Sequence, residues 1–242
     1  MAQITNGINN QVGGSLSGAT NQFLIANDSN TASSVALEIV RVGGGTAGDP
    51  FTQYTVTGAT TFSEGIDNSD SDAFVIAAST ALGTTNTVRI ATTGEINFPL
   101  QSAFLALSGS ASNVTGDGTA YTLGSSVALT EVYDQNSDFN TNGTYTAPVT
   151  GIAQFGGSIT LLQIGAAHTD MYVLIQASNR TLTSTEVNAT NYANPSGTAN
   201  IPFCCNVDMD AADTCTFSIT VLNGTKVVDT SGNTFIYGGI LY

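Results

Sequence analysis

The fold is decided by residues 133–151, which read YDQNSDFNTNGTYTAPVTG. This stretch combines a polar turn with a short strand in which Tyr145 stands between two threonines, and Pro148 and Gly151 follow. Proline cannot donate a hydrogen bond to a sheet and lies at strand ends or edges, whereas glycine permits the backbone angles of sharp turns. A long apolar segment begins directly after Gly151, so the stretch predicts two strands joined by a corner.

Similar strands are expected on both sides of this corner, from residue 101 to residue 242. Segments rich in Val, Ile, Phe, Tyr and Thr alternate there with turn residues, and no segment has a convincing helical pattern. This many strands predict an all-β, two-sheet sandwich of the jelly-roll type. The last segment is expected to be an interior strand, because it is strongly apolar and free chain ends normally fray. The expected strands are Ala103–Leu107, Tyr121–Leu123, Val127–Tyr133, Thr144–Thr146, Ile152–Leu162, Tyr172–Ala177, Ile201–Val207, Cys215–Leu222, Lys226–Asp229 and Thr234–Leu241.

In the first hundred residues, turn residues also separate short apolar segments, but these segments contain fewer apolar residues. Strands are expected at roughly 10-residue spacing, and Pro99 ends the series. About 80 such residues bury little surface by themselves. The sequence therefore predicts a slender β-rich shaft that is stabilised by wrapping around copies of itself. The expected strands are Phe23–Ala26, Val35–Val42, Tyr54–Val56, Thr61–Phe62, Phe74–Ile76, Val88–Ile90 and Ile96–Phe98.

Three parts are thus expected along the chain: a leader or attachment segment over residues 1–21, an oligomerising shaft over residues 22–100 and a jelly-roll domain over residues 101–242. Apolar residues in the leader recur every four positions, but glycines interrupt a helix there, each at a cost of about 1 kcal/mol. Self-association through these apolar residues is the alternative. They are Ile4, Ile8, Val12 and Leu16.

The charge of the chain excludes two classes of partner. The net charge is −14, from 18 acidic residues against four basic ones. Without a basic stripe the chain cannot neutralise phosphates, which excludes nucleic acid, and an anionic membrane would repel it. No run of about 20 apolar residues is present to span a membrane, and the first 14 residues lack the basic and apolar parts of a signal peptide. The acidity is interpreted as an aid to solubility, with capture of a divalent cation as the alternative.

The three cysteines are too few for a disulfide framework. If residues 210–213 form the tip of a hairpin, Cys215 lies opposite Asp208, and neither Cys204 nor Cys205 is in register with it. The cysteines are therefore interpreted as small buried apolar residues, with one bridge as the alternative. Zinc is not expected, because it needs four ligands at a recognisable spacing and a single histidine does not complete such a set.

Residues suited to catalysis are sparse. His168, the one histidine, lies in a loop-like stretch and is interpreted as a surface or loop imidazole. A Gly-x-Ser-x-Gly elbow and a phosphate-binding loop are both absent from the sequence. Clusters of aspartates could serve a glycosidase, but they are ordinarily turns, because Asp accepts hydrogen bonds from nearby backbone amides. No catalytic residue is therefore predicted. The clusters are Asp67/Asp70/Asp72, Asp134/Asp138 and Asp208/Asp210/Asp213.

Several segments, taken together in their order, carry a resemblance. They are Ala103–Ala106, Asn113–Thr119, the stretch through Gly143–Gly151, Asp208–Thr214 and Tyr237–Leu241. The second half of the chain resembles the globular-head family shared by the complement recognition subcomponent and the tumour necrosis factor superfamily, in the form found in viral and bacterial fibre proteins. The resemblance implies a homotrimer of jelly-roll heads and a place for Tyr145 in the core. Where the family usually has an aromatic residue, this chain has Ala153 and keeps only the later Phe155.

The first half resembles segments of viral tail fibres, on Gly43–Pro50, Gly65–Ile76 and Thr93–Ile96. The resemblance implies a slender β shaft that leads into three packed heads. Some members of the head family hold calcium near the trimer apex, which makes Asp208, Asp210 and Asp213 the candidate ligands for calcium. Calcium is the only cofactor that the sequence leaves open.

The leading hypothesis is a non-enzymatic structural and adhesive fibre protein, homotrimeric and extracellular, on a virion or a cell-surface appendage. Its head would contact a cell-surface receptor or glycan, and three weak contacts would gain avidity from being linked. The alternative is a filament, matrix or coat protein that uses the head to assemble with copies of itself. A polysaccharide-degrading enzyme ranks last, because the residues for it are missing.

Overall fold

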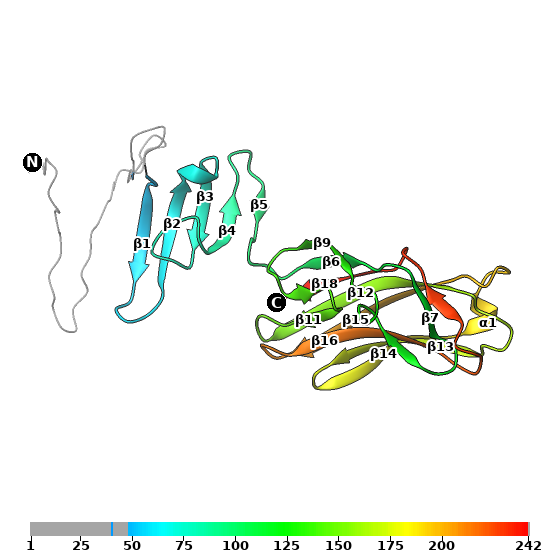
Figure 1. Ribbon diagram of the computed structural model, residues 1–242. Coiled ribbons are helices and arrows are strands. Elements are labelled where there is room, and N and C mark those ends of the chain that lie inside the picture. Colours follow the sequence, from blue (N-terminus) through cyan, green and yellow to red (C-terminus); the bar gives the residue numbers. More distant parts are fainter. Residues whose placement is uncertain (1–39, 41–47, 242) are drawn as a thin grey trace, which may run out of the picture.

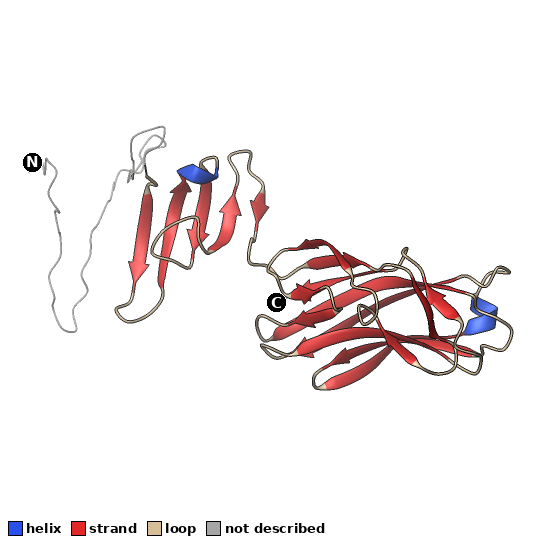
Figure 2. Cartoon of the chain, in the orientation of Figure 1, coloured by secondary structure: helices blue, strands red, loops and turns tan. Residues whose placement is uncertain are grey.

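The computed structural model describes residue 40 and residues 48–241, which form two sets of strands (Figure 1). The expected leader, the strand Phe23–Ala26 and all of Val35–Val42 except Val40 lie outside these residues. Strands make up nearly all the regular structure of the described part, so the all-β prediction is confirmed (Figure 2). No helix in that part is long and apolar enough to cross a membrane.

The first set is a five-stranded antiparallel sheet in which each strand pairs with the next one along the chain. All five strands expected in this region are present. Their order in the sheet is β1 (Phe51–Thr55), β2 (Thr61–Asp67), β3 (Ala73–Ala77), β4 (Asn86–Ile90) and β5 (Ile96–Asn97).

The turn between β2 and β3 explains one of the aspartate clusters. The carboxylate of Asp67 accepts a hydrogen bond from the backbone of Ser69 and begins the short 3-10 helix η1 (Asn68–Asp70). Asp70 receives two hydrogen bonds from the guanidinium of Arg89, which hold the pKa of that carboxyl below its usual value. These aspartates shape a turn, as the sequence predicts for such clusters.

One face of this sheet is covered by the chain itself. The loop between β3 and β4, residues 78–85, lies across it: Ser63 Oγ donates to the Ser79 carbonyl at 2.8 Å, and Gln53 Nε2 donates to the Thr80 carbonyl at 2.9 Å. Leu82 of the loop packs into a small buried cluster with three residues of β3. They are Ala73, Val75 and Ala77.

The second set is a sandwich of two antiparallel sheets, joined to the first through residues 98–103. The seven-stranded sheet contains, in order, β7 (Ala111–Thr115), β17 (Val228–Thr230), β12 (Gly151–Leu162), β18 (Phe235–Ile240), β6 (Phe104–Leu107) and β9 (Thr130–Asp134), with β15 (Ala199–Met209) also on β12. The six-stranded sheet contains β10 (Phe139–Asn140), β11 (Thr144–Thr146), β16 (Thr214–Val221), β13 (Asp170–Ala177) and β14 (Arg180–Asn188), with β8 (Ala120–Thr122) also on β16. One apolar core lies between the two sheets, so the jelly-roll prediction is confirmed.

Aromatic side chains from both sheets fill the centre of this core. Phe155 of β12 contacts Tyr145 and Phe217 edge-on, with ring centroids 5.1 and 5.3 Å apart, and Phe104 stacks on Phe139 at 4.2 Å. Tyr145 is fully buried, as expected. Phe155 thus supplies aromatic packing two residues beyond the departure from the family pattern at position 153.

The strand β18 lies in the interior of its sheet, which confirms that expectation. It pairs with β12 along one side, through Gly156–Tyr237 for example, and with β6 along the other, through Leu105–Tyr237. Backbone hydrogen bonds on both sides hold this last strand in place.

The predicted hairpin at residues 210–213 is wrong. These residues do form a tight turn, in which the Asp213 amide donates to the Asp210 carbonyl at 2.9 Å. However, β15 before the turn pairs with β12, whereas β16 after it pairs with β11 and β13, so the chain crosses from one sheet to the other. Cys215 consequently lies opposite Tyr145 and Ala177, not opposite Asp208.

Four elements of the sandwich were not expected as such: β7, β10, β14 and a single helical turn, α1 (Ala189–Tyr192). The strand β14 is the edge of its sheet and is mostly polar and exposed. It also closes one side of the sandwich, because Ser184 Oγ donates to the Cys204 carbonyl at 3.1 Å and Thr185 Oγ1 donates to the Pro202 carbonyl at 2.8 Å. Hydroxyls of one edge strand thus satisfy carbonyls of β15, the edge strand of the other sheet.

Candidate assembly surface

The outward face of the seven-stranded sheet is apolar. Since side chains alternate across a strand, Leu105 and Leu107 of β6 and Phe235 and Tyr237 of β18 point away from the core, in the pairs Leu105–Tyr237 and Leu107–Phe235. Tyr133 of β9 lies opposite Leu105. We call these five residues the outer apolar face. Tyr133 is 50% exposed, Leu107 41% and Tyr237 39%.

A glycine pair beside this face lets aromatic rings lie flat against the sheet. The ring of Tyr237 covers Gly156 of β12, where an added Cβ would lie 2.6 Å from Tyr237 Cζ. On the core side, the ring of Phe203 covers Gly157, where an added Cβ would lie 3.0 Å from Phe203 Cε1. Both contacts are closer than carbon atoms approach, so only glycine fits at these positions without displacing a ring.

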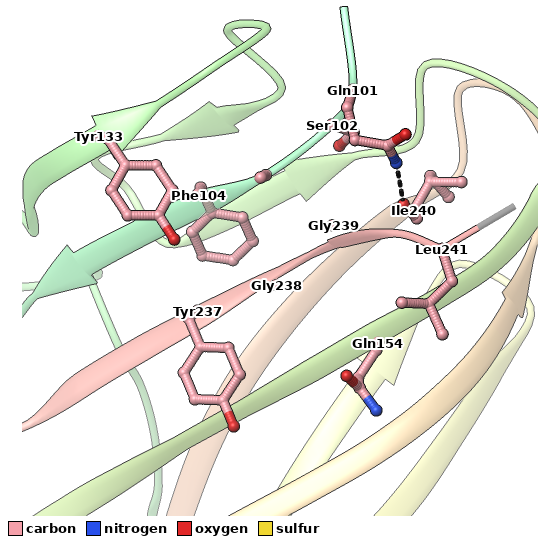
Figure 3. Close-up of a pocket in the computed structure, with 11 residues that line it drawn as sticks. Gln101, Ser102, Phe104, Tyr133, Gln154, Tyr237, Gly238, Gly239, Ile240 and Leu241 are labelled. Atoms are coloured by element: carbon pink, nitrogen blue, oxygen red, sulfur yellow. Dashed lines mark hydrogen bonds between the residues drawn. The ribbon is translucent and has the colours of Figure 1, made fainter. Parts of the chain in front are cut away.

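A hollow of about 280 Å³ lies at one end of the outer apolar face (Figure 3). Tyr133, Tyr237, Gln154 and Leu241 line it, and they come from three strands and the residue that follows β18. Gln101 closes it on one side by donating from Nε2 to the carbonyl of Ile240. The hollow is shallow and mostly apolar, which suits contact with another protein surface better than capture of a charged small molecule.

Charge is sparse around the outer apolar face, although on β9 the exposed Glu131 stands two residues from Tyr133. In the described strands β6, β12 and β18, every outward position carries an apolar or uncharged polar side chain. A charged pair stands at the far edge of the sheet, where Arg180 Nη2 lies 3.3 Å from Asp208 Oδ2. An uncharged apolar area is unusual on a chain with a net charge of −14.

The stretch 133–151 supports this sheet from within. The Asp134 carboxylate accepts hydrogen bonds from the backbone amides of Asp138 and Phe139 at 3.1 and 3.0 Å, which fixes the polar turn. Below the turn, Tyr145 Oη lies 2.7 Å from Ser102 Oγ, and burial raises the pKa of Tyr145 to about 12. Burial also raises the pKa of Asp138, opposed by hydrogen bonds from Ser102 and Asn136. These polar groups hold one another in place.

The three candidate calcium ligands lie around the turn that joins the two sheets. Asp213 Oδ2 accepts hydrogen bonds from the Asp210 amide and from Asn179 Nδ2, at 3.0 and 3.3 Å, and Asp208 is paired with Arg180. Over the described residues, no group of three or more His, Cys, Asp or Glu side chains is arranged to hold a metal ion. Calcium at this turn stays a prediction.

His168 lies in a loop, as interpreted, but it is buried rather than on the surface. Its Nδ1 accepts a hydrogen bond from the Gly165 amide at 2.8 Å, and its Nε2 lies 3.3 Å from the Thr225 carbonyl. Gly224 makes room for the ring, since an added Cβ there would lie 2.2 Å from His168 Cδ2. The imidazole therefore links two loops, and the His168 carbonyl accepts a hydrogen bond from Thr190 Oγ1 of α1 at 3.0 Å.

The interpretation of the cysteines as buried apolar residues holds for only one of them. Cys215 is buried in the core, where desolvation raises its pKa to about 12, but Cys205 is half-buried and Cys204 is exposed. The cause is register: Cys204 occupies an outward position on β15, opposite Gly156. All three lie within the described residues and are unpaired.

The outer apolar face was not predicted from the sequence, although a signal for it exists. In the segments FLAL (104–107) and FIY (235–237), apolar residues occupy inward and outward positions alike. A strand that is apolar on both faces is typical of one covered on both faces.

The chain was compared with known proteins at three levels. No family model matches it, and no curated protein is similar to it in sequence. Among solved structures it is similar to the globular domain of the zebrafish complement 1qA protein, with 13% identity and a TM-score of 0.40 over 59% of this chain and 98% of that one. It is also similar to murine APRIL at pH 8.0, with 14% identity and a TM-score of 0.40 over 58% of this chain and 99% of that one. The fold assignment rests on the strand topology described above.

Proposed function

We propose that the chain is a non-enzymatic structural and adhesive protein that assembles as a homotrimer through its outer apolar face. In this proposal it belongs to an extracellular fibre of the viral tail-fibre kind, and the loops of its head bind a receptor or a glycan on a cell surface.

The outer apolar face is the observation that supports this proposal. Exposed apolar patches on otherwise polar proteins mark interaction sites. Burial of apolar surface contributes roughly 25 cal/mol per Å², and a copy of the same chain brings a matching area free of charged side chains.

The relief of the face favours a closed ring of copies. The half formed by β9, β6 and β18 is raised by Tyr133, Leu105 and Tyr237, whereas the half formed by β12 and β15 is lower, because beyond the Tyr237 ring it carries smaller outward side chains such as Ser158 and Cys204. A raised half and a low half on one face suit a head-to-tail contact between neighbours, and such contacts generate rings when the rotation closes. With a jelly-roll head, a ring of three is the assembly that the resemblance implies.

The loops at the α1 end of the sandwich are the proposed contact with a receptor or glycan. That end lies opposite the connection to the five-stranded sheet (Figure 1). Tyr192 is 44% exposed there, beside the exposed amides Asn191, Asn194 and Asn223. An aromatic ring with neighbouring amides offers stacking and hydrogen bonds without charge, which suits neutral sugars.

The assembly is tested by light scattering and native mass spectrometry on the full chain. Wild type is expected to be a trimer, and Tyr237→Glu is expected to be a monomer at micromolar concentration. Tyr172→Glu is the matched control, because Tyr172 occupies an outward position on β13 of the other sheet and should leave the trimer intact. A monomeric wild type, or a Tyr237→Glu variant that stays trimeric, would contradict the proposal.

The location is tested by labelling with antibody in the electron microscope. Labelling at the tips of virion tails supports the fibre proposal, whereas labelling along cell-surface filaments or over a coat supports assembly without receptor binding. For the loops, a glycan array should show binding that Tyr192→Ala weakens at least about tenfold, the effect expected from losing one stacking contact.

A further inference from the structure

The second face of the five-stranded sheet is largely exposed, and in the described part of the chain Val40 borders it, lining a hollow with Ile66 and Phe74. Strand pairing places Ile66, Phe74, Ile90 and Ile96 in one row across four strands. Neighbouring rows on the same face contain Ile76–Val88 and Tyr54–Phe62. We call these eight residues the apolar shaft face: Tyr54, Phe62, Ile66, Phe74, Ile76, Val88, Ile90 and Ile96.

Most of the large apolar side chains of this sheet are on the apolar shaft face, whereas Phe51 is on the other face. The covered face holds small residues beneath Leu82, whereas on the apolar shaft face Ile96 is 59% exposed, Tyr54 56% and Phe62 47%. A sheet that stood alone in water would gain by the reverse arrangement, with large residues inside. The arrangement is expected where the uncovered face is buried in an assembly.

One carboxylate side chain, Glu64, occupies a strand position on this face, and it accepts a hydrogen bond from Tyr54 Oη at 2.7 Å. Arg89 points to the opposite face, where it is paired with Asp70. A second copy presents the same nearly neutral face, so two such faces approach each other without strong repulsion.

We infer that the apolar shaft face packs directly against the same face of the other copies of this chain. This inference rests on the proposed homotrimer and adds to it a second contact, formed by side chains of the shaft. The strands β1 to β5 pair with one another within one chain, so among these strands the contact is made by packed faces rather than by strands of different chains wrapped around one another.

The size of the face fits a secondary contact. Five strands about 4.8 Å apart, each with roughly five residues of about 3.4 Å, present an area of about 400 Å². A stable interface buries about 800 Å² on each partner, so the apolar shaft face supplies about half of that amount. Phe98 and Leu100, which are 53% and 46% exposed, continue the apolar surface along the chain towards the head. In the proposed trimer, the head contact would have to supply the remaining area of a stable interface.

Disulfide trapping in the full chain tests this inference. Cys204 and Cys205 are first replaced by Ser, and Cys215 is kept because it is buried. Single cysteines are then placed, one per variant, at Phe62, Phe74, Ile76 and Val88. A disulfide needs Cα atoms about 4.4 to 6.8 Å apart, so these positions bond between copies only if the faces meet.

At least one of the four positions is expected to form disulfide-linked dimers at least about tenfold faster than Thr57→Cys, because a packed assembly holds its members at millimolar effective concentration. Thr57 is the control because it is exposed in the turn between β1 and β2, off the face. In a trimer each bond joins two chains and leaves the third one free, so the yield should level off at about two thirds of the chains.

A second variant does not depend on oxidation. Val88→Glu should raise the concentration at which the trimer dissociates at least about tenfold, since it buries an unpaired charge in the contact, whereas Thr57→Glu should not change it. If wild type is a trimer and none of the four cysteines bonds faster than Thr57→Cys, the inference is overturned and the proposed function stands. If wild type is a monomer, the proposed function fails and the inference fails with it.

Discussion

The sandwich and the five-stranded sheet differ in how they distribute large side chains. The sandwich buries its largest residues, including Tyr145, Phe155 and Phe217, in one core between two sheets. The five-stranded sheet buries one small cluster beneath the loop of residues 78–85 and leaves Phe62 and Phe74 outside. The sandwich contains its own second layer, whereas the smaller sheet needs one from elsewhere. Neighbouring parts of one chain thus differ in whether they can bury their own large side chains.

The largest effect is expected from removing residues 237–242. This deletion takes away most of β18, which holds β12 and β6 together and closes the core with Ile240. The chain should then fail to express in soluble form, which is checked by comparing soluble and total expression with wild type. A soluble truncated chain with an unchanged melting temperature would show that the sandwich does not depend on this strand.

The next effect compares the two cores directly. Phe155→Ala should lower the free energy of unfolding of the sandwich by about 3 to 5 kcal/mol, because it opens a cavity among three aromatic rings. Val75→Ala should cost only about 1 to 2 kcal/mol, because few side chains surround Val75. Denaturant unfolding measures both variants. Equal losses would contradict the difference between the two regions.

Alkaline pH should affect the sandwich through Tyr145. Its pKa is raised from 10 to about 12 in the folded state, so the folded protein holds a proton that the unfolded chain releases. The contribution is complete below pH 10 and is lost as pH rises to about 12, at a cost on the order of 2 to 3 kcal/mol. Tyr145→Phe should flatten this part of the stability curve, measured by urea unfolding from pH 9 to 12. Cys215 is the internal control. Its pKa is also raised, from 9 to about 12, so its own loss of stability begins near pH 9 and should remain in the Tyr145→Phe variant.

The smallest effect concerns calcium at Asp208, Asp210 and Asp213. Extracellular calcium sites bind with Kd values near 1 mM, so 1 mM calcium should stabilise the head by about 0.4 kcal/mol, a shift of roughly 1 to 2 °C in Tm. Addition of chelator should reverse the shift, and Asp213→Asn should abolish it. A Tm that does not change with chelator would contradict calcium binding at this turn.

Much of the fold could be predicted, because strand signals are local. Alternating apolar residues gave the position of nearly every strand that contributes to the core, and Thr144–Thr146 matches β11 in full. The strand β14 was missed because an edge strand with polar side chains looks like a loop in sequence. The crossing at residues 210–213 was missed for another reason: a tight turn shows that the chain reverses, but not to which sheet the next strand belongs.

The candidate surfaces were harder to predict, because they depend on which face of a strand meets solvent. Leu105 and Tyr237 look like core residues in the sequence, and only the pairing of β6 with β18 shows that they point outward. For His168, the neighbouring residues suggested a surface loop, but Gly224, which opens space for the ring, is distant in sequence.

The contact between β14 and β15 has a consequence for crowding. If heads stand side by side on a particle, their local concentration far exceeds that in solution. Any sheet edge with unpaired backbone groups would then form hydrogen bonds with the edge of a neighbouring head. Ser184 and Thr185 occupy two carbonyls of the β15 edge with their own hydroxyls. Replacing these two small side chains would leave the fold in place but free the two carbonyls. In a dense array, neighbouring heads would then associate through their β15 edges.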